Sequence, residues 1–220
     1  MGRYIRIARS TNGENSVTSA RIYLAGPDVF LTEAVALAQA KRDLCARYGF
    51  IGVSPIDNEI DKSNISVQET AHRISAANET VIHQCNLVIA NITPFRGPSA
   101  DVGTAYEMGY ARALGLPVLA YTNVDGDLLA RTRQALGNDI AQRAPGHFED
   151  SFRMVIENFH QVDNLMLTGA VQASGVPVVV TPVEMELRFT SLVGFEECLK
   201  QALRLIHPST YSRPRALEGA

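Results

Sequence analysis

Two carboxylates stand close together in the stretch Asp101-Val-Gly-Thr-Ala-Tyr-Glu107-Met-Gly, which follows the apolar run 86–92 and a loop. The order of residue types predicts a buried strand, a Gly/Pro-rich loop and a helix whose first turn carries Glu107. In open α/β sheets this kind of junction lies at the carboxyl edge of the strands, where small ligands bind. A carboxylate held there can be a nucleophile, an acid–base group or a helix cap, and which of these applies decides the function.

The spacing of Thr104 and Glu107 is that of a capping box, in which the glutamate bonds back to the amide at the helix start. In the alternative interpretation, the positive end of the helix keeps Glu107 ionised, ready to attack an anomeric carbon. Asp101, whose position also suits a turn residue, would then handle a proton on the leaving group. One attacking carboxylate and one that moves a proton is the arrangement of retaining glycosidases. The residues alone leave both interpretations open.

Three further side chains are candidates for the same site. Asn78 interrupts the apolar face of the predicted helix 66–85, so it is either a buried structural amide or a group that orients a carboxylate or a ligand. Phe30 follows Gly26-Pro27-Asp28 in the loop that leaves the first strand, where a flat ring can stack on a planar base. Tyr23 lies on that strand, where the ordinary interpretation is a core aromatic with a hydrogen-bonded hydroxyl.

These side chains need a scaffold, and the chain predicts alternating strands and helices. Strands are expected at 21–26, 50–55, 86–92, 116–121 and 176–180. Helices are expected at 32–48, 66–85, 104–114, 163–173 and 195–206. This alternation is typical of βαβ units, so we expect an α/β fold: one doubly wound, mainly parallel five-stranded sheet, flavodoxin-like or Rossmann-like, with helices on both faces. The polar and apolar residues of 123–160 follow neither a helical nor a strand period. We interpret this segment as a lid or an oligomer contact.

The composition is that of an ordinary globular protein. Of 220 residues, 46% are hydrophobic and 20% are charged, the net charge is −3, and at most two Lys or Arg residues are adjacent. A nucleic-acid groove or an anionic-membrane patch needs concentrated positive charge, so the expected partners are small molecules. The polar residues 1–18 are predicted to form an N-terminal arm, and residues 19–220 a single domain.

Cysteine and histidine positions indicate no disulfide, metal or cofactor. The three scattered cysteines favour reduced thiols in a cytosolic protein. The five histidines have no HxxH or HExxH spacing, and the sequence contains no GxGxxG, P-loop or GxSxG motif. No signal core precedes the first strand, and no apolar run reaches the roughly 20 residues of a membrane helix. We therefore expect a soluble, cytoplasmic protein that uses no metal and no cofactor.

Four separated blocks resemble the nucleoside 2-deoxyribosyltransferase family. They are Ile22 to Phe30 (IYLAGPDVF), Pro55 to Asn58 (PIDN), Asn91 to Gly109 with its DVGTAYEMG core, and Asp163 to Met166 (DNLM). Their order and spacing, over most of residues 20–170, carry the resemblance. Members of the family cleave the N-glycosidic bond of a 2′-deoxynucleoside and pass the sugar to another base, without a metal or an organic cofactor.

The resemblance implies catalytic roles for three residues. Glu107 resembles the nucleophile that forms a covalent deoxyribosyl intermediate, with net retention at the anomeric carbon. Asp101 resembles the carboxylate that interacts with the departing and the incoming base. Tyr23 resembles the tyrosine that orients the nucleophile. The implied substrates are 2′-deoxynucleosides and free purine or pyrimidine bases.

The resemblance also implies substrate-binding residues. Asn164 and Met166 look like the family's pair that enters a neighbouring subunit's site and holds the sugar 5′-hydroxyl, which implies a homo-oligomer. Gly26 and Asp57 lie in the first two blocks and are assigned to substrate binding. Asn78 aligns with a family aspartate, and an amide there can orient the nucleophile or a base but cannot act as a carboxylic acid.

Two other functions stay open at this point. A hydrolase of the same superfamily would cleave 2′-deoxynucleoside 5′-monophosphates with water as the acceptor, and it would need serine or basic contacts for the phosphate. The block 163–166 offers an amide and a thioether instead, which suit an uncharged 5′-hydroxyl. A non-catalytic nucleotide-binding module would keep the crevice but would have no use for an ionised Glu107 beside Asp101.

Overall fold

A five-stranded parallel sheet forms the centre of the structure. The computed structural model describes residues 19–58, 60–61 and 63–206, and the predicted arm 1–18 lies outside this part of the chain. The strands are β1 (Arg21–Ala25), β2 (Ile51–Val53), β3 (Leu87–Asn91), β4 (Val118–Thr122) and β8 (Val179–Val180). Their order is β2-β1-β3-β4-β8, and every neighbouring pair is parallel. This is the strand order of flavodoxin-like sheets, so the predicted α/β fold is confirmed.

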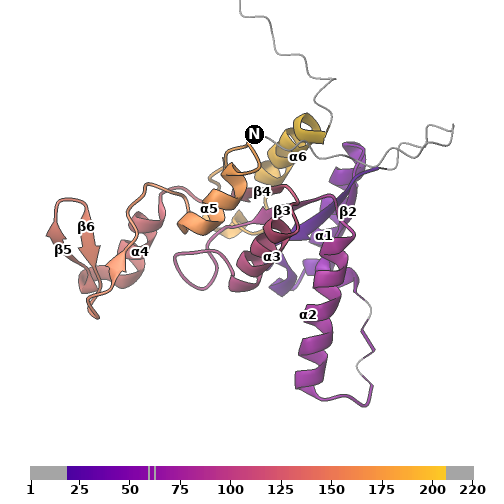
Figure 1. The fold of residues 1–220 in the computed structure, drawn as a ribbon, viewed down its shortest axis with the longest axis horizontal. Coiled ribbons are helices and arrows are strands. Elements are labelled where there is room, and N and C mark those ends of the chain that lie inside the picture. The colour runs from indigo at the N-terminus through magenta and orange to yellow at the C-terminus, as the bar shows by residue number, and fades with distance from the viewer. Residues whose placement is uncertain (1–18, 59, 62, 207–220) are drawn as a thin grey trace, which may run out of the picture.

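Helices cover both faces of this sheet (Figure 1). The main helices are α1 (Ala34–Arg47), α2 (Val67–His83), α3 (Val102–Ala113), α5 (Leu165–Gln172) and α6 (Val193–Ile206). The 3-10 helices are η1 (Pro27–Phe30), η2 (Pro55–Asp57), η3 (Gly137–Asp139) and η4 (Met185–Leu187). Helices α1 and α6 pack on one face, whereas α3, α5 and the end of α2 pack on the other. Within the described residues, none of the helices combines the length and the apolar character that crossing a membrane requires.

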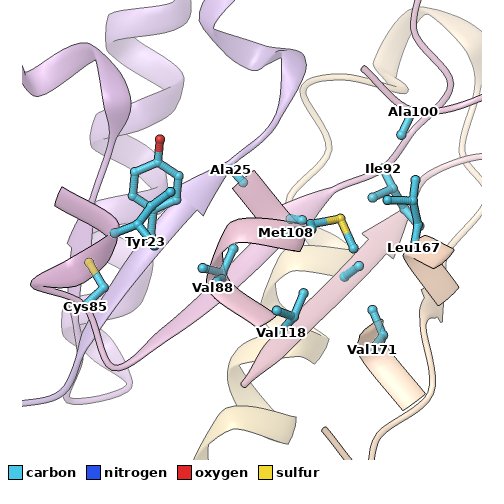
Figure 2. Close-up of a cluster of buried hydrophobic side chains, with 14 residues drawn as sticks. Tyr23, Ala25, Cys85, Val88, Ile92, Ala100, Met108, Val118, Leu167 and Val171 are labelled. Atoms are coloured by element: carbon cyan, nitrogen blue, oxygen red, sulfur yellow. The ribbon is translucent and has the colours of Figure 1, made fainter. Parts of the chain in front are cut away.

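The face that carries α3 and α5 supports the candidate site. Figure 2 shows its buried cluster, in which Tyr23 from β1 and Val88 from β3 lie with Met108 from α3, and Leu167 and Val171 from α5 complete the layer. Strands β3 and β4 are buried on both faces, which is why their sequences are continuous apolar runs rather than alternating ones. This packing fixes α3, and with it the carboxylates of Asp101 and Glu107, against the sheet.

Helix α2 exists as predicted, but its predicted apolar face is buried only at the C-terminal end, at Ile82 and the following Cys85. The side chain of Val67 is 83% exposed and that of Ile74 is 41% exposed, and Ile82 is the one buried residue of the helix. The cause is visible in Figure 1, where most of α2 extends beyond the sheet instead of lying on it. Apolar residues at helical spacing therefore mark a face of α2 that the described residues leave uncovered.

Residues 123–160 contain regular structure that the sequence pattern did not indicate. Helix α4 (Leu128–Leu136) is followed by a small antiparallel sheet of β5 (Ala141–Ala144), β6 (His147–Glu149) and β7 (Val155–Ile156). This unit, which we call the side lobe, stands out from the body of the molecule in Figure 1. Its strands are two to four residues long, which is too short for an alternating pattern to be recognised.

Candidate active site

A cavity of about 520 Å³ lies at the carboxyl edge of the sheet, between η1, η2, α2 and the start of α3. This volume is in the range of small-molecule sites. Five of the predicted site residues line it: Gly26, Phe30, Asn78, Asp101 and Glu107. They come from three segments that are distant in the sequence: the turn 26–30, helix α2 and the start of α3.

Glu107 is held by Tyr23, and the capping-box interpretation is wrong. Helix α3 begins at Val102, so Glu107 lies in the second helical turn and points to β1 instead of to its own helix start. The Tyr23 hydroxyl donates a hydrogen bond of 2.5 Å to Oε1 of Glu107. Among the described residues no hydrogen bond is made to Oε2, so the second oxygen is left for a ligand.

Burial controls the protonation of Glu107. It raises the pKa of this carboxyl from 4.5 to about 7; the hydrogen bond from Tyr23 opposes the rise, and the negative charge of Asp101 adds to it. The expectation that the helix start keeps Glu107 fully ionised is therefore wrong, because α3 starts a turn earlier and desolvation dominates. Burial and the nearby Glu107 also raise the pKa of Tyr23, so the tyrosine stays a neutral donor.

Asp101 is the N-cap of α3. Its Oδ2 accepts hydrogen bonds from the backbone N of Thr104 at 2.9 Å and from the Thr104 hydroxyl at 3.1 Å. A Cβ at Gly103 would lie 3.0 Å from the same oxygen, so a glycine suits this turn. No bond to Oδ1 is made within the described residues. Asp101 thus fixes the helix start through one oxygen and faces the cavity with the other unpaired.

The cavity wall opposite α3 carries a pair of amides. Asn58 Nδ2 donates to Oδ1 of Asn78 at 2.8 Å, and both side chains line the cavity. Asn58 was not among the predicted site residues, although it ends the Pro55–Asn58 block and follows strand β2, which is a signal that could have identified it. The pair offers both a hydrogen-bond donor and an acceptor to a ligand.

Phe30 and Gly26 form the third wall. Phe30 is 57% exposed, and Phe95 stacks on one of its faces with ring centroids 5.3 Å apart and an angle of 12° between the planes. The Arg96 guanidinium also lies over this ring, with its Cζ 5.3 Å from the centroid, so a planar ligand would share the Phe30 ring with Phe95 and Arg96. At Gly26 a Cβ would lie 2.9 Å from the Cβ of Asn91, so the turn can approach β3 only because residue 26 is a glycine.

Besides the buried Tyr23, three predicted residues do not line this cavity. Asp57 accepts a hydrogen bond from the backbone N of Ser54 at 3.0 Å and pairs with Arg42 at 2.6 Å. Asn164 is the N-cap of α5: its Oδ1 accepts from the backbone N of Met166 at 3.0 Å. Met166 itself is 72% exposed. Asp57 thus has a local structural task, whereas Asn164 and Met166 lie on the surface of the protomer.

The site shows no arrangement suited to a metal ion. Over the described part of the chain, no three His, Cys, Asp or Glu side chains group as metal ligands. The polar side chains that line the described cavity are two carboxylates, two amides and the Thr104 hydroxyl, and the buried Tyr23 hydroxyl bonds to one of the carboxylates.

The chain is similar to known proteins. A family model described as nucleoside 2-deoxyribosyltransferase matches residues 22–166, more than half of the chain. An uncharacterised protein of Schizosaccharomyces pombe is 29% identical over 165 residues, which cover 70% of this chain and 78% of that protein.

Solved structures are also similar to this chain. A 2-desoxiribosyltransferase from Leishmania mexicana superposes with a TM-score of 0.53 at 28% identity, covering 79% of this chain and 97% of that one. A 2-deoxyribosyltransferase from Bacillus psychrosaccharolyticus is 23% identical, with a TM-score of 0.41 over 53% of this chain and 82% of the other. On the match of the family model over residues 22–166, the chain belongs to the nucleoside 2-deoxyribosyltransferase family.

Proposed function

We propose that the protein transfers 2-deoxyribose between nucleobases, with Glu107 as the nucleophile of a covalent intermediate. The observation that carries the proposal is the Tyr23–Glu107 hydrogen bond at the wall of the cavity. It fixes Oε1 and leaves Oε2 to attack C1′ of a bound 2′-deoxynucleoside. The bond from C1′ to the base nitrogen breaks as the bond to Oε2 forms, and its electron pair leaves with the base.

The second half of the reaction reverses the first with a different base. The incoming base attacks C1′ from the side that the first base left, Glu107 is released as a carboxylate, and two inversions give net retention. A 2′-deoxy sugar suits this chemistry because it lacks an electron-withdrawing hydroxyl beside the developing positive charge. The apolar walls formed by Val29, Ile56 and Ile74 help to keep water from the intermediate.

Asp101 is the group for proton exchange with the bases. Among the residues that line the cavity in the described chain, Asp101 and Glu107 are the two acidic ones. Because Asn78 cannot deliver a proton, the departing base receives it from Asp101 or from water that Asp101 orients. The amides of Asn58 and Asn78 then bind the base edge, and Phe30 stacks on its plane.

The test is to mix a 2′-deoxynucleoside with a different free base and to follow both products by chromatography. The proposal requires that a new deoxynucleoside appears and that its amount equals the base released. A 2′-deoxynucleoside 5′-monophosphate N-glycosidase would instead release base and sugar phosphate without an acceptor. The described cavity is lined by no Lys or Arg that could bind a phosphate, which favours the free nucleoside.

The pH dependence of the reaction follows from the burial of Glu107. Since only the ionised carboxylate attacks, kcat/KM is expected to fall about tenfold per pH unit below the pKa of about 7. Tyr23→Phe removes the hydrogen bond that lowers the pKa of Glu107. We therefore expect the fall of kcat/KM with decreasing pH to begin at a higher pH in this variant. Initial rates across the neutral range check both statements, with donor and acceptor bases that do not themselves titrate there. If kcat/KM fell over the same pH range in the wild type and in Tyr23→Phe, the role of Tyr23 would be contradicted.

The proposal includes a homo-oligomer in which Asn164 and Met166 complete the site of a neighbouring subunit. Both residues lie outside the cavity of their own protomer, and Met166 is exposed. The cavity continues into a groove of about 440 Å³ between α2 and α3, where Ile74 and Tyr106 are exposed. This groove leaves an apolar path by which a partner subunit reaches the sugar.

Mixing two inactive variants tests this arrangement. Glu107→Gln and the double variant N164A/M166A are each expected to be nearly inactive. After subunit exchange, a hybrid dimer has one site with every wild-type group, so a random mixture regains about a quarter of the wild-type rate. A fully active monomer in light scattering, or no recovery in mixtures that do exchange subunits, would contradict the shared site.

A further inference from the structure

A buried ion pair lies behind the turn that forms one wall of the cavity. The Lys41 ammonium donates to Oδ2 of Asp28, and their side chains are 4% and 12% exposed. Asn91 Nδ2 donates to Oδ1 of Asp28 at 2.7 Å. The same amide accepts, through its Oδ1, from the backbone N of Thr93 at 3.0 Å. Each carboxylate oxygen of Asp28 therefore has one partner, from α1 or from the end of β3.

Lys41 occupies a position where an apolar residue is expected. It lies in the buried stripe of α1 between Ala38 and Leu44. Its Nζ is 5.8 Å from the ring centroid of Tyr121 and 5.5 Å from that of Phe195. Lysine is almost never fully buried unless it is paired. Burial lowers the pKa of Lys41.

We infer that Asp28, Lys41 and Asn91 are positioning residues for the wall of the reaction cavity formed by η1. Gly26, Val29 and Phe30 line the cavity, whereas the Asp28 side chain between them points away from it into the protein. Fixing this one carboxylate therefore fixes the turn on both sides of it. The inference rests on the proposed function, since this wall is the one proposed to bind the base.

Charge balance is what makes the ion pair effective. Without Lys41, the Asp28 carboxylate would stay buried with one hydrogen bond, and a buried charge without its partner is strongly unfavourable. The free space beside Asp28 is a gap of about 10 Å³, which is at most the room that one water molecule needs and does not hold the hydration shell of a carboxylate. The carboxylate would reach water by displacing the turn, which carries Phe30 away from the cavity. When both charges are removed, no buried carboxylate is left to displace the turn.

The test compares Lys41→Met with the double variant D28N/K41M. In the double variant, the amide introduced at position 28 still accepts the hydrogen bond from Asn91, and no charge is buried. Lys41→Met is expected to raise KM for the free base roughly tenfold or more with kcat within about threefold of wild type. Hydrogen exchange of a peptide spanning residues 26–31 should speed up in the same variant. The double variant is expected to bring both quantities back to near the wild-type values.

A matched control and a second variant complete the experiment. Lys200→Met removes a lysine of α6 whose ion pair with Glu197 is solvent-exposed. It should leave both the KM for the free base and the hydrogen exchange of the peptide 26–31 unchanged. Asp28→Asn alone should raise the KM and the hydrogen exchange of the turn by less than Lys41→Met does, because Lys41 can give up its proton. Adding Lys41→Met to Asp28→Asn should return both quantities to near the wild-type values. This second comparison decides the matter if Lys41→Met does not fold.

Two results would overturn the inference. One is a Lys41→Met protein that unfolds at lower temperature but keeps the wild-type KM and the wild-type exchange of the turn, since the ion pair would then only support the fold. The other is a double variant as defective as the single one. If the wild-type protein exchanged no bases at all, the proposed function would fail, while hydrogen exchange would still test how the turn is held.

Discussion

Glu107→Gln is expected to lower the rate of base exchange by about a thousandfold or more while the protein stays folded. The amide keeps the shape of the side chain and can still accept the hydrogen bond from Tyr23, but it cannot form the ester with C1′. Initial rates give the loss of turnover. Mass spectrometry of the intact protein, after a quench with a 2′-deoxynucleoside, should show a deoxyribosyl adduct on wild type and none on the variant.

The chain offers a matched control in a second tyrosine–glutamate pair. The Tyr48 hydroxyl donates to Oε1 of Glu196 at 2.8 Å, and neither residue lines the cavity. Glu196→Gln is expected to keep the wild-type rate and the adduct. If Glu107→Gln exchanged bases as fast as wild type, the nucleophile would be another group. If the protein were a nucleotide-binding module without catalysis, the wild type and Glu107→Gln would bind the ligand with the same affinity, and neither would form an adduct.

The sheet could be predicted because its central strands carry their signal locally. Strands β3 and β4 are buried on both faces and therefore appear as uninterrupted apolar runs between turn residues. The last strand was predicted at 176–180, but only Val179 and Val180 pair with β4. Pro177 has no backbone N–H to donate, which explains the short pairing at this edge.

The start of α3 shows how a small error in a boundary changes the chemistry. Asp101 and Thr104 are both good N-cap residues, and the sequence does not decide between them. The structure places the cap at Asp101, three residues earlier than predicted. That difference turns Glu107 from the helix start to Tyr23, a residue 84 positions away in the sequence. A contact of this range leaves no local pattern.

Periodicity identified an apolar face on α2 but not what covers it. The helix extends beyond the sheet, so Val67 and Ile74 are exposed in the protomer. The opposite failure occurs in α1, where Lys41 looks like a surface residue in the sequence but is buried against Asp28. In α1 the deciding fact is a partner from another part of the fold, whereas the apolar face of α2 has no covering partner among the described residues.

The site itself was found largely through the resemblance of separated blocks. Gly26 and Phe30 meet Asp101 and Glu107 in one cavity, as those blocks implied, and Asn78, which lies outside the blocks, lines the same cavity. Block membership does not say which way a side chain points, however. In the second block it is Asn58 that lines the cavity, while Asp57 bonds to Ser54 and Arg42.

Glu107→Gln is also expected to stabilise the protein, by about 3 kcal/mol at about pH 8 and by less than about 1 kcal/mol at about pH 5. The folded protein holds a proton on Glu107 up to a pKa of about 7, whereas the unfolded chain loses it near the ordinary value of 4.5. The resulting stabilisation of the wild type is present at low pH and is lost as the pH rises through about 7. Glutamine never ionises, so the variant does not suffer this loss.

Urea unfolding of both proteins at acidic, neutral and basic pH measures the effect as a gap in unfolding free energy that widens with pH at constant m-value. Glu196→Gln is the control. Its difference in unfolding free energy from the wild type should not widen in this way as the pH rises. A flat gap for Glu107→Gln would mean that the cavity does not resist the charge of its carboxylate. A widening gap, together with lost turnover, would show that the protein carries an ionised Glu107 at a cost to its own stability, as expected of a group kept for catalysis.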